Sequence, residues 1–138
     1  TEFGYNYRMT DISAAIGREQ LKKLSKFNSR RREIAEMYNS ELSDLVVTPK
    51  NRRGHVFHQY TIRTEKRDQL KEFLFDRKIN TGIYYPSLLF NYPSMEAYKS
   101  ICPNAEILIK EVLSLPVHPA LSDSDVFEVI SSIKEFFE

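Results

Sequence analysis

Apolar residues between positions 11 and 42 recur in steps of three to five, the spacing of an amphipathic helix. Thr10 is a suitable N-cap for this helix, and Asp11 places a negative charge in its first turn, where the helix dipole favours one. A helix of about 30 residues is long for a globular protein, so we expect it to pack against more than one element or domain. The apolar positions are Ile12, Ile16, Leu21, Leu24, Phe27, Ile34, Met37 and Tyr38.

The remainder of the chain alternates between strand-like and helix-like patterns. Segments 55–63 and 79–85 are rich in aromatic and β-branched residues and are predicted strands, the second of them ended by Pro86. Between them, Thr64 is the expected cap of a helix whose apolar face holds Leu70, Phe73 and Leu74. These patterns predict a strand, a helix and a second strand between positions 55 and 85.

The last third of the sequence follows the same alternation. An irregular stretch over 88–103 precedes a short helix that begins at Asn104, and 113–117 is a third predicted strand. Ser122 is the expected cap of a final amphipathic helix. The fold class that follows is α+β: a small antiparallel or mixed sheet covered by helices and preceded by a long N-terminal helix.

Composition and charge narrow the possible functions. The 138 residues suffice for one domain, and 41% hydrophobic residues can fill its core. A net charge of +1 gives no reason to expect binding to nucleic acid or to a membrane surface. The chain has a single cysteine, Cys102, and cannot form an internal disulfide, which agrees with a cytoplasmic location. No apolar run approaches the roughly 20 residues of a membrane span.

A polar, aromatic loop ahead of the first helix carries the strongest motif. Asn6 and Arg8 offer a neutral donor and a fixed cation, both suited to phosphate oxygens. The pattern G-Y-N-Y-R-M-T-D-I-x-A-A-I-G-x-x-Q-L resembles the DegT/StrS family of pyridoxal-phosphate sugar aminotransferases. Further matches in the family's order are R-R-R-E-I-A with Tyr38, H-V-F-H-Q-Y, G-I-Y-Y-P and L-S-L-P-V-H-P.

The resemblance implies a fold, an activity and an assembly. The fold would be the small domain of fold-type I aminotransferases, with residues 1–45 as interface loop and linking helix and 46–138 as the α+β subdomain. The parent enzyme would be a homodimer that moves an amino group, usually from glutamate, to a keto carbon of a nucleotide-linked sugar. Its cofactor would be pyridoxal phosphate, and the pathway would make amino sugars or surface polysaccharide.

The family's Schiff-base lysine lies in an N-terminal domain, ahead of the segment that this chain resembles. The chain also begins at Thr1 rather than Met. We therefore expect a fragment of a larger enzyme that is inactive alone and forms no internal aldimine.

The family also implies roles for particular residues, each with a simpler alternative. Asn6 would reach the cofactor phosphate of the partner subunit, although asparagine is common in turns. Arg8 would lie at the active-site mouth, or pair with a local carboxylate. Tyr84 and Tyr85 would line the sugar pocket, or be ordinary strand residues with wet hydroxyls. His118 would lie near the active-site entrance, although a lone histidine is more often structural.

Some residues depart from the family or exclude other chemistry. The family's P-x-P-x-H stretch reads P-S-L-L-F at positions 86–90, so the second proline and the histidine are absent. His55 and His58 would face opposite sides of a strand, which argues against a metal site. The arginines at 30–32 are most simply a solvated helix face.

Two other functional classes stay open. One is a non-catalytic interaction or regulatory module with the same fold, and the other is an amino-acid-directed transaminase of fold-type I. In addition, the small and apolar residues at 12–17 and the aromatic stretch 84–98 predict exposed surface that a larger protein or a second subunit would cover.

Overall fold

The structure is a computed structural model that describes residue 5 and residues 7–138. It combines helices with a small antiparallel sheet, which confirms the predicted α+β class. In chain order the elements are α1 (Asp11–Leu42), β1 (Tyr60–Arg63), α2 (Arg67–Asp76), the 3-10 helices η1 (Leu89–Asn91) and η2 (Pro93–Tyr98), α3 (Pro103–Glu111), β2 (Val112–Leu115) and α4 (Asp123–Phe137).

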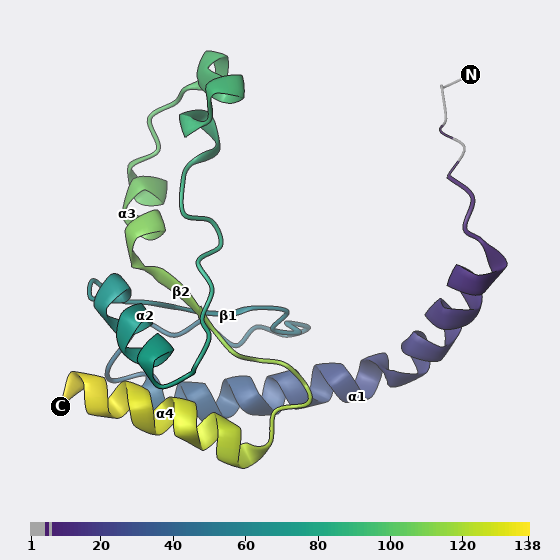
Figure 1. Cartoon of the computed structure of the whole chain (residues 1–138), viewed down its shortest axis with the longest axis horizontal. Coiled ribbons are helices and arrows are strands. Elements are labelled where there is room, and N and C mark those ends of the chain that lie inside the picture. Colours follow the sequence, from purple (N-terminus) through teal and green to yellow (C-terminus); the bar gives the residue numbers. More distant parts are fainter. Residues whose placement is uncertain (1–4, 6) are drawn as a thin grey trace.

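The long helix α1 has the predicted start and end. The Oγ1 atom of Thr10 accepts a hydrogen bond from the Ser13 amide at 3.3 Å, so Thr10 is the N-cap. Only the C-terminal half of α1 packs in the core, where it runs beside α4, whereas its N-terminal half extends away from the sheet (Figure 1). The buried residues of α1 are Ile34, Ala35, Tyr38 and Leu42.

The extended half of α1 exposes a row of apolar side chains, as the sequence predicts. Ile12 is 75% exposed, Ile16 58% and Leu21 68%. Burying such side chains is worth about 1.5–3 kcal/mol each, so an uncovered row is unfavourable in water. This part of α1 is therefore a surface that another protein segment can cover.

The sheet has two strands, β1 and β2, with Tyr60 opposite Leu115 and Arg63 opposite Val112. An isolated bridge lies on each side of it, at Val47 beside β1 and at Gly82 beside β2. β2 confirms the third predicted strand, shifted by a residue or two. The sheet is antiparallel, the first of the two alternatives that the sequence left open.

The predicted strand 55–63 is wrong in its first part, because β1 begins only at Tyr60. The Nδ1 atom of His55 accepts the Phe57 amide at 3.0 Å, and Phe57 has a φ of 47°. A left-handed residue with a local side-chain bond turns the backbone and prevents an extended strand.

The predicted strand 79–85 is also wrong, since Gly82 alone makes a bridge to β2. Its first residue, Ile79, donates its amide to the Leu74 carbonyl in the turn that follows α2. Thr64 does not cap α2: the helix begins after Lys66, whose amide donates to the Thr64 Oγ1 atom at 3.3 Å.

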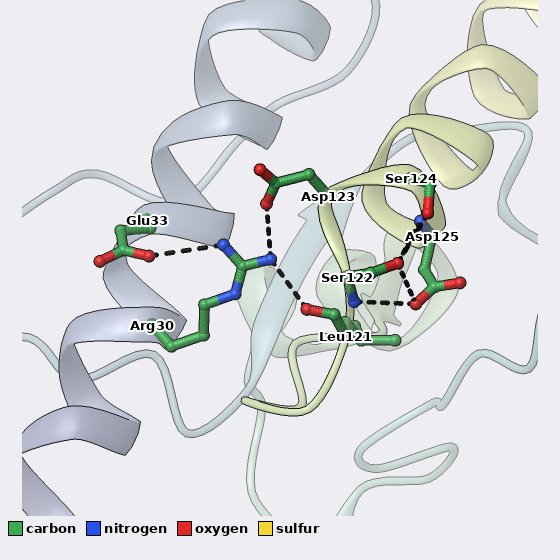
Figure 2. Close-up of polar contacts among 7 residues, drawn as sticks. All are labelled: Arg30, Glu33, Leu121, Ser122, Asp123, Ser124 and Asp125. Carbon is green, nitrogen blue, oxygen red and sulfur yellow. Dashed lines mark hydrogen bonds and ion pairs between the residues drawn. The ribbon is translucent and has the colours of Figure 1, made fainter.

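Helix α4 is fixed by a capping box and by a charged contact with α1. Ser122 and Asp125 exchange hydrogen bonds between side chain and backbone, which confirms Ser122 as the N-cap. Arg30 of α1 donates to the Leu121 carbonyl at 2.8 Å and to Asp123 at 2.7 Å, as Figure 2 shows. The interpretation of residues 30–32 as a solvated face is therefore wrong for Arg30, whose side chain is only 20% exposed.

The segment between α2 and β2 forms an arm that carries η1, η2 and α3 and extends away from the sheet (Figure 1). Tyr85, Tyr92, Tyr98 and Ile101 are exposed on it or at its base, as the sequence predicts for the aromatic stretch. None of the described helices is both long and apolar enough to cross a membrane.

Candidate functional site

A hollow of about 440 Å³ lies at the side of β2 next to Gly82, between the sheet and the middle of α1. Different parts of the chain meet there: α1, the loop before β1, the segment after α2, and the end of β2 with the residues that follow. The lining residues are Arg31, His58, Gln59, Asn80, Thr81, Gly82, Tyr84, Ser114, Leu115, Pro116, Val117 and His118.

Tyr84 lines the hollow where its ring lies over Gly82. Gly82 and Ser114 exchange both backbone hydrogen bonds, at 3.0 and 2.7 Å, so this glycine is fixed against β2. A Cβ atom on Gly82 would lie 2.4 Å from the Tyr84 Cε2 atom. The ring of Tyr84 therefore occupies the space that any other side chain at position 82 would fill.

His118 lies in a turn in which a backbone hydrogen bond determines which ring nitrogen carries the proton. The Nδ1 atom accepts the Ala120 amide at 3.1 Å. In the neutral ring the proton is then on Nε2, which is left as a donor for another group.

The residues just before His118 are tied to α1 by a buried tyrosine. The Tyr38 hydroxyl donates to the Pro116 carbonyl at 2.8 Å. Burial raises the pKa of Tyr38, and likewise that of Tyr60, so both hydroxyls stay protonated donors near neutral pH. The wall that carries His118 is therefore fixed to the core.

Arg31 lies at the hollow, a position that the sequence analysis missed. It is half-buried, and its nearest polar partner is the Asn28 side chain at 3.4 Å. A signal for it exists in the sequence: Arg31 precedes Ile34, Ala35 and Tyr38 at helical spacing, on the stripe that enters the core. A cation on a core-facing stripe is a better indicator of a site than the same cation on a solvated face.

The hollow brings together only part of the predicted site. Tyr84 and His118 line it, whereas Tyr85 is 76% exposed and does not. Arg8 is exposed and precedes α1, whose N-terminal half extends away from the sheet (Figure 1). Asn6 lies outside the described residues. The binding roles of these residues stay predictions.

The hollow is lined by one arginine, two histidines and neutral polar groups. Arg31, His58 and His118 line it, and the described residues of its lining include neither a carboxylate nor a lysine. Without a lysine amine, the hollow does not fit the covalent attachment of pyridoxal phosphate. Nor do residue 5 and residues 7–138 contain a group of histidine, cysteine, aspartate and glutamate side chains able to hold a metal ion.

Comparison with known proteins decides the family. The model of the DegT/DnrJ/EryC1/StrS aminotransferase family matches residues 1–134. The chain belongs to this family. The resemblance seen in the G-Y-N-Y-R-M loop is thereby confirmed.

The chain is also similar to individual proteins of known sequence or structure. The chain is 41% identical to a pleiotropic regulatory protein of Geobacillus stearothermophilus and 38% identical to GDP-perosamine synthase of Escherichia coli O157:H7. In each case the match covers 97% of this chain and 38% of the relative. Its fold is similar to that of the NtdA protein of Bacillus subtilis with bound cofactor PMP, with a TM-score of 0.89 and 27% identity over 99% of this chain and 34% of the other. The chain thus spans little more than a third of the length of these relatives.

Proposed function

We propose that this chain forms part of a pyridoxal-phosphate-dependent aminotransferase that aminates a keto carbon of a nucleotide-linked sugar, with glutamate as amino donor. The observation that carries the proposal is the hollow beside β2. There Tyr84 and His118, taken from separate family motifs, meet in a chain of the DegT/DnrJ/EryC1/StrS aminotransferase family. The name of the similar E. coli protein, GDP-perosamine synthase, supports a sugar substrate.

In this proposal the chain supplies the substrate-side wall of the active site. The Tyr84 hydroxyl and the His118 Nε2–H group bind and orient sugar hydroxyls. Gly82 leaves the space that the Tyr84 ring occupies, and the bond from Tyr38 to Pro116 holds the His118 segment. Tyr85, outside the hollow, would lie at the mouth of the site. Because Arg8 precedes the far end of α1, its role at an active-site mouth would be in a second subunit.

When bound, pyridoxal phosphate supplies an electron sink for the transfer of the amino group. Since the hollow offers no lysine, we assign the attachment of the cofactor to a part of a longer protein, and we expect the 138-residue chain alone to be inactive. Asn6 would hold the cofactor phosphate across a homodimer interface, and the exposed half of α1 would belong to that interface. Residues 1–45 would thus link subunits, while 46–138 form the α+β subdomain, in a cytoplasmic enzyme.

A regulatory or interaction module is the second candidate. The similar Geobacillus stearothermophilus protein is named as a pleiotropic regulator, and at 41% its identity is higher than that of the E. coli synthase. In this case the hollow would bind a ligand without turning it over. The two candidates differ in one observable result, the transfer of nitrogen.

The test is a chimaera in which this chain replaces the matched region of GDP-perosamine synthase. The chimaera is incubated with [15N]glutamate and a panel of nucleotide-linked keto-sugars, and the sugar product is analysed by mass spectrometry. We expect 15N in the sugar, and we expect its loss on Tyr84→Phe but not on the matched control Tyr98→Phe, since Tyr98 is exposed on the arm. A chimaera that folds and binds cofactor but labels no sugar would refute the enzymatic proposal.

Two further measurements test cofactor binding, one on the isolated chain and one on Asn6 in the chimaera. After incubation with pyridoxal phosphate and removal of the free cofactor, the isolated chain should retain none of the absorbance near 420 nm, roughly the band of the lysine-bound cofactor. In the chimaera, Asn6→Ala should weaken cofactor retention by roughly 1.5–3 kcal/mol, the cost of one hydrogen bond to a charged phosphate. Unchanged retention would return Asn6 to the role of an ordinary turn residue.

A further inference from the structure

The neighbouring arginines of α1 have different surroundings. Arg30 is paired with Asp123 and Glu33, and Arg32 donates to the Ser29 hydroxyl at 3.3 Å. Arg31 lies between them in the sequence but points to a different side of the helix, toward the hollow. Within residue 5 and residues 7–138, the ion pairs do not include Arg31.

A half-buried guanidinium without a carboxylate partner is costly. Moving a cation partly out of water is unfavourable unless an anion or several acceptors compensate for it. Within the described part of the chain, Arg31 makes one hydrogen bond, to the Asn28 amide oxygen, and its 3.4 Å is longer than a normal hydrogen bond. Most of the donors on the Arg31 guanidinium are therefore available to something that enters the hollow.

The rest of the hollow also favours an anion. Its lining adds His58 and His118 as donors, together with neutral polar side chains such as Asn80 and Thr81, and among the described residues it contains no aspartate or glutamate. A concave surface with cationic and donor groups and no carboxylate attracts anions. The planar fork of arginine matches carboxylates and phosphates in particular, because both accept two parallel hydrogen bonds.

We propose that Arg31 binds the anionic group of a reactant, a carboxylate or a phosphate, in the hollow beside β2. The inference rests on the proposed function for the identity of the reactants. The carboxylate would come from the amino-acid donor, and the phosphate from the nucleotide-linked sugar. The shared chemistry is a planar or tetrahedral oxyanion held by a guanidinium.

The test is a titration of the 15N-labelled 138-residue chain, followed by NMR at constant ionic strength. Inorganic phosphate, GDP and glutarate are the probes, and sodium chloride is the control. We expect phosphate-type or carboxylate-type probes to shift the amide signals of Gly82, Ser114 and His118. Stronger binding of GDP and phosphate assigns the site to the nucleotide, and stronger binding of glutarate assigns it to the donor.

Three variants make the test specific to Arg31. Arg31→Gln should weaken binding by roughly tenfold or more, as expected for the loss of a charged hydrogen-bond donor. Arg31→Lys keeps the charge but not the fork, so its affinity should lie between that of Arg31→Gln and that of the wild type. Arg32→Gln removes the same charge next door and should bind like the wild type. Dispersed amide signals verify that each variant is folded.

The outcomes are distinct from those of the proposed function. Equal affinity for Arg31→Gln and Arg32→Gln, shifts that map away from the hollow, or no binding of any probe to the wild-type chain would overturn the assignment. Labelling of sugar by the chimaera is a separate result. The amino transfer can fail while anion binding persists, and anion binding can fail while the amino transfer persists.

Discussion

The bond between Tyr38 and Pro116 connects the core to the segment that carries His118, and Tyr38→Phe removes it alone. The Tyr38 ring is fully buried and its hydroxyl donates to the Pro116 carbonyl at 2.8 Å. Phenylalanine keeps the ring contact with Tyr60, whose centroid is 4.9 Å away, so packing is preserved. What changes is a single donor, and the carbonyl of Pro116 loses its partner.

The expected cost follows from the surroundings of that carbonyl. A hydrogen bond contributes a net 0.5–1.5 kcal/mol, roughly, and an acceptor left without a partner costs about 1–3 kcal/mol when water cannot reach it. Pro116 is half-buried, so water partly replaces the tyrosine. We therefore expect a loss of about 1–2 kcal/mol, which lowers the Tm of a domain of this size by roughly 3–8 °C.

Urea denaturation of the 138-residue chain, followed by circular dichroism, measures this loss as a lower midpoint at an unchanged slope. Two variants are matched controls. Tyr60→Phe removes a hydroxyl that donates to the half-buried Asn39 side chain, which can turn toward water, so its cost should be smaller. Tyr98→Phe, on the exposed arm, should cost less than about 0.5 kcal/mol. If Tyr38→Phe is no more destabilising than Tyr98→Phe, this bond does not hold the segment.

Other predictions concern the cap of α4 and the wall of the hollow. Hydrogen bonds from the Ser122 side chain, and then from its backbone, lower the pKa of Asp125. The stabilisation of the folded state by the Asp125 carboxylate is present above the unfolded pKa of about 4 and is lost as pH falls through the lower folded pKa. Asp125→Asn should therefore flatten the acid limb of a curve of unfolding free energy against pH. Arg30→Met should cost about 1–2 kcal/mol in urea denaturation, because the helix contact is lost, and a change below about 0.3 kcal/mol would contradict it. Gly82→Ala should displace the exposed Tyr84 ring with little change in Tm, yet lower sugar labelling by the chimaera; unchanged labelling would contradict this.

The helices could be predicted from the sequence because their signals are local. Thr10 and Ser122 cap their helices with side-chain bonds to amides three residues on, and the apolar stripes continue to the helix ends. The strands were less predictable, since aromatic content does not show where a ladder partner exists. Residues 55–59 and most of 79–85 have strand composition, but the bond from His55 to Phe57 and the partner available only to Gly82 depend on the folded chain.

The site shows the same division between local and non-local information. Motifs single out Tyr84 and His118 as candidates, whereas their meeting at one hollow depends on the pairing of Gly82 with Ser114 and on the bond from Tyr38 to Pro116. The place of Arg31 is hidden when the arginine run at 30–32 is taken as one surface feature. On a helix, successive residues point about 100° apart, so such a run cannot share one environment. Arg30 pairs with α4, whereas Arg31 reaches the hollow. Two neighbouring residues of identical charge therefore have different roles, structural for Arg30 and, in our proposal, anion binding for Arg31.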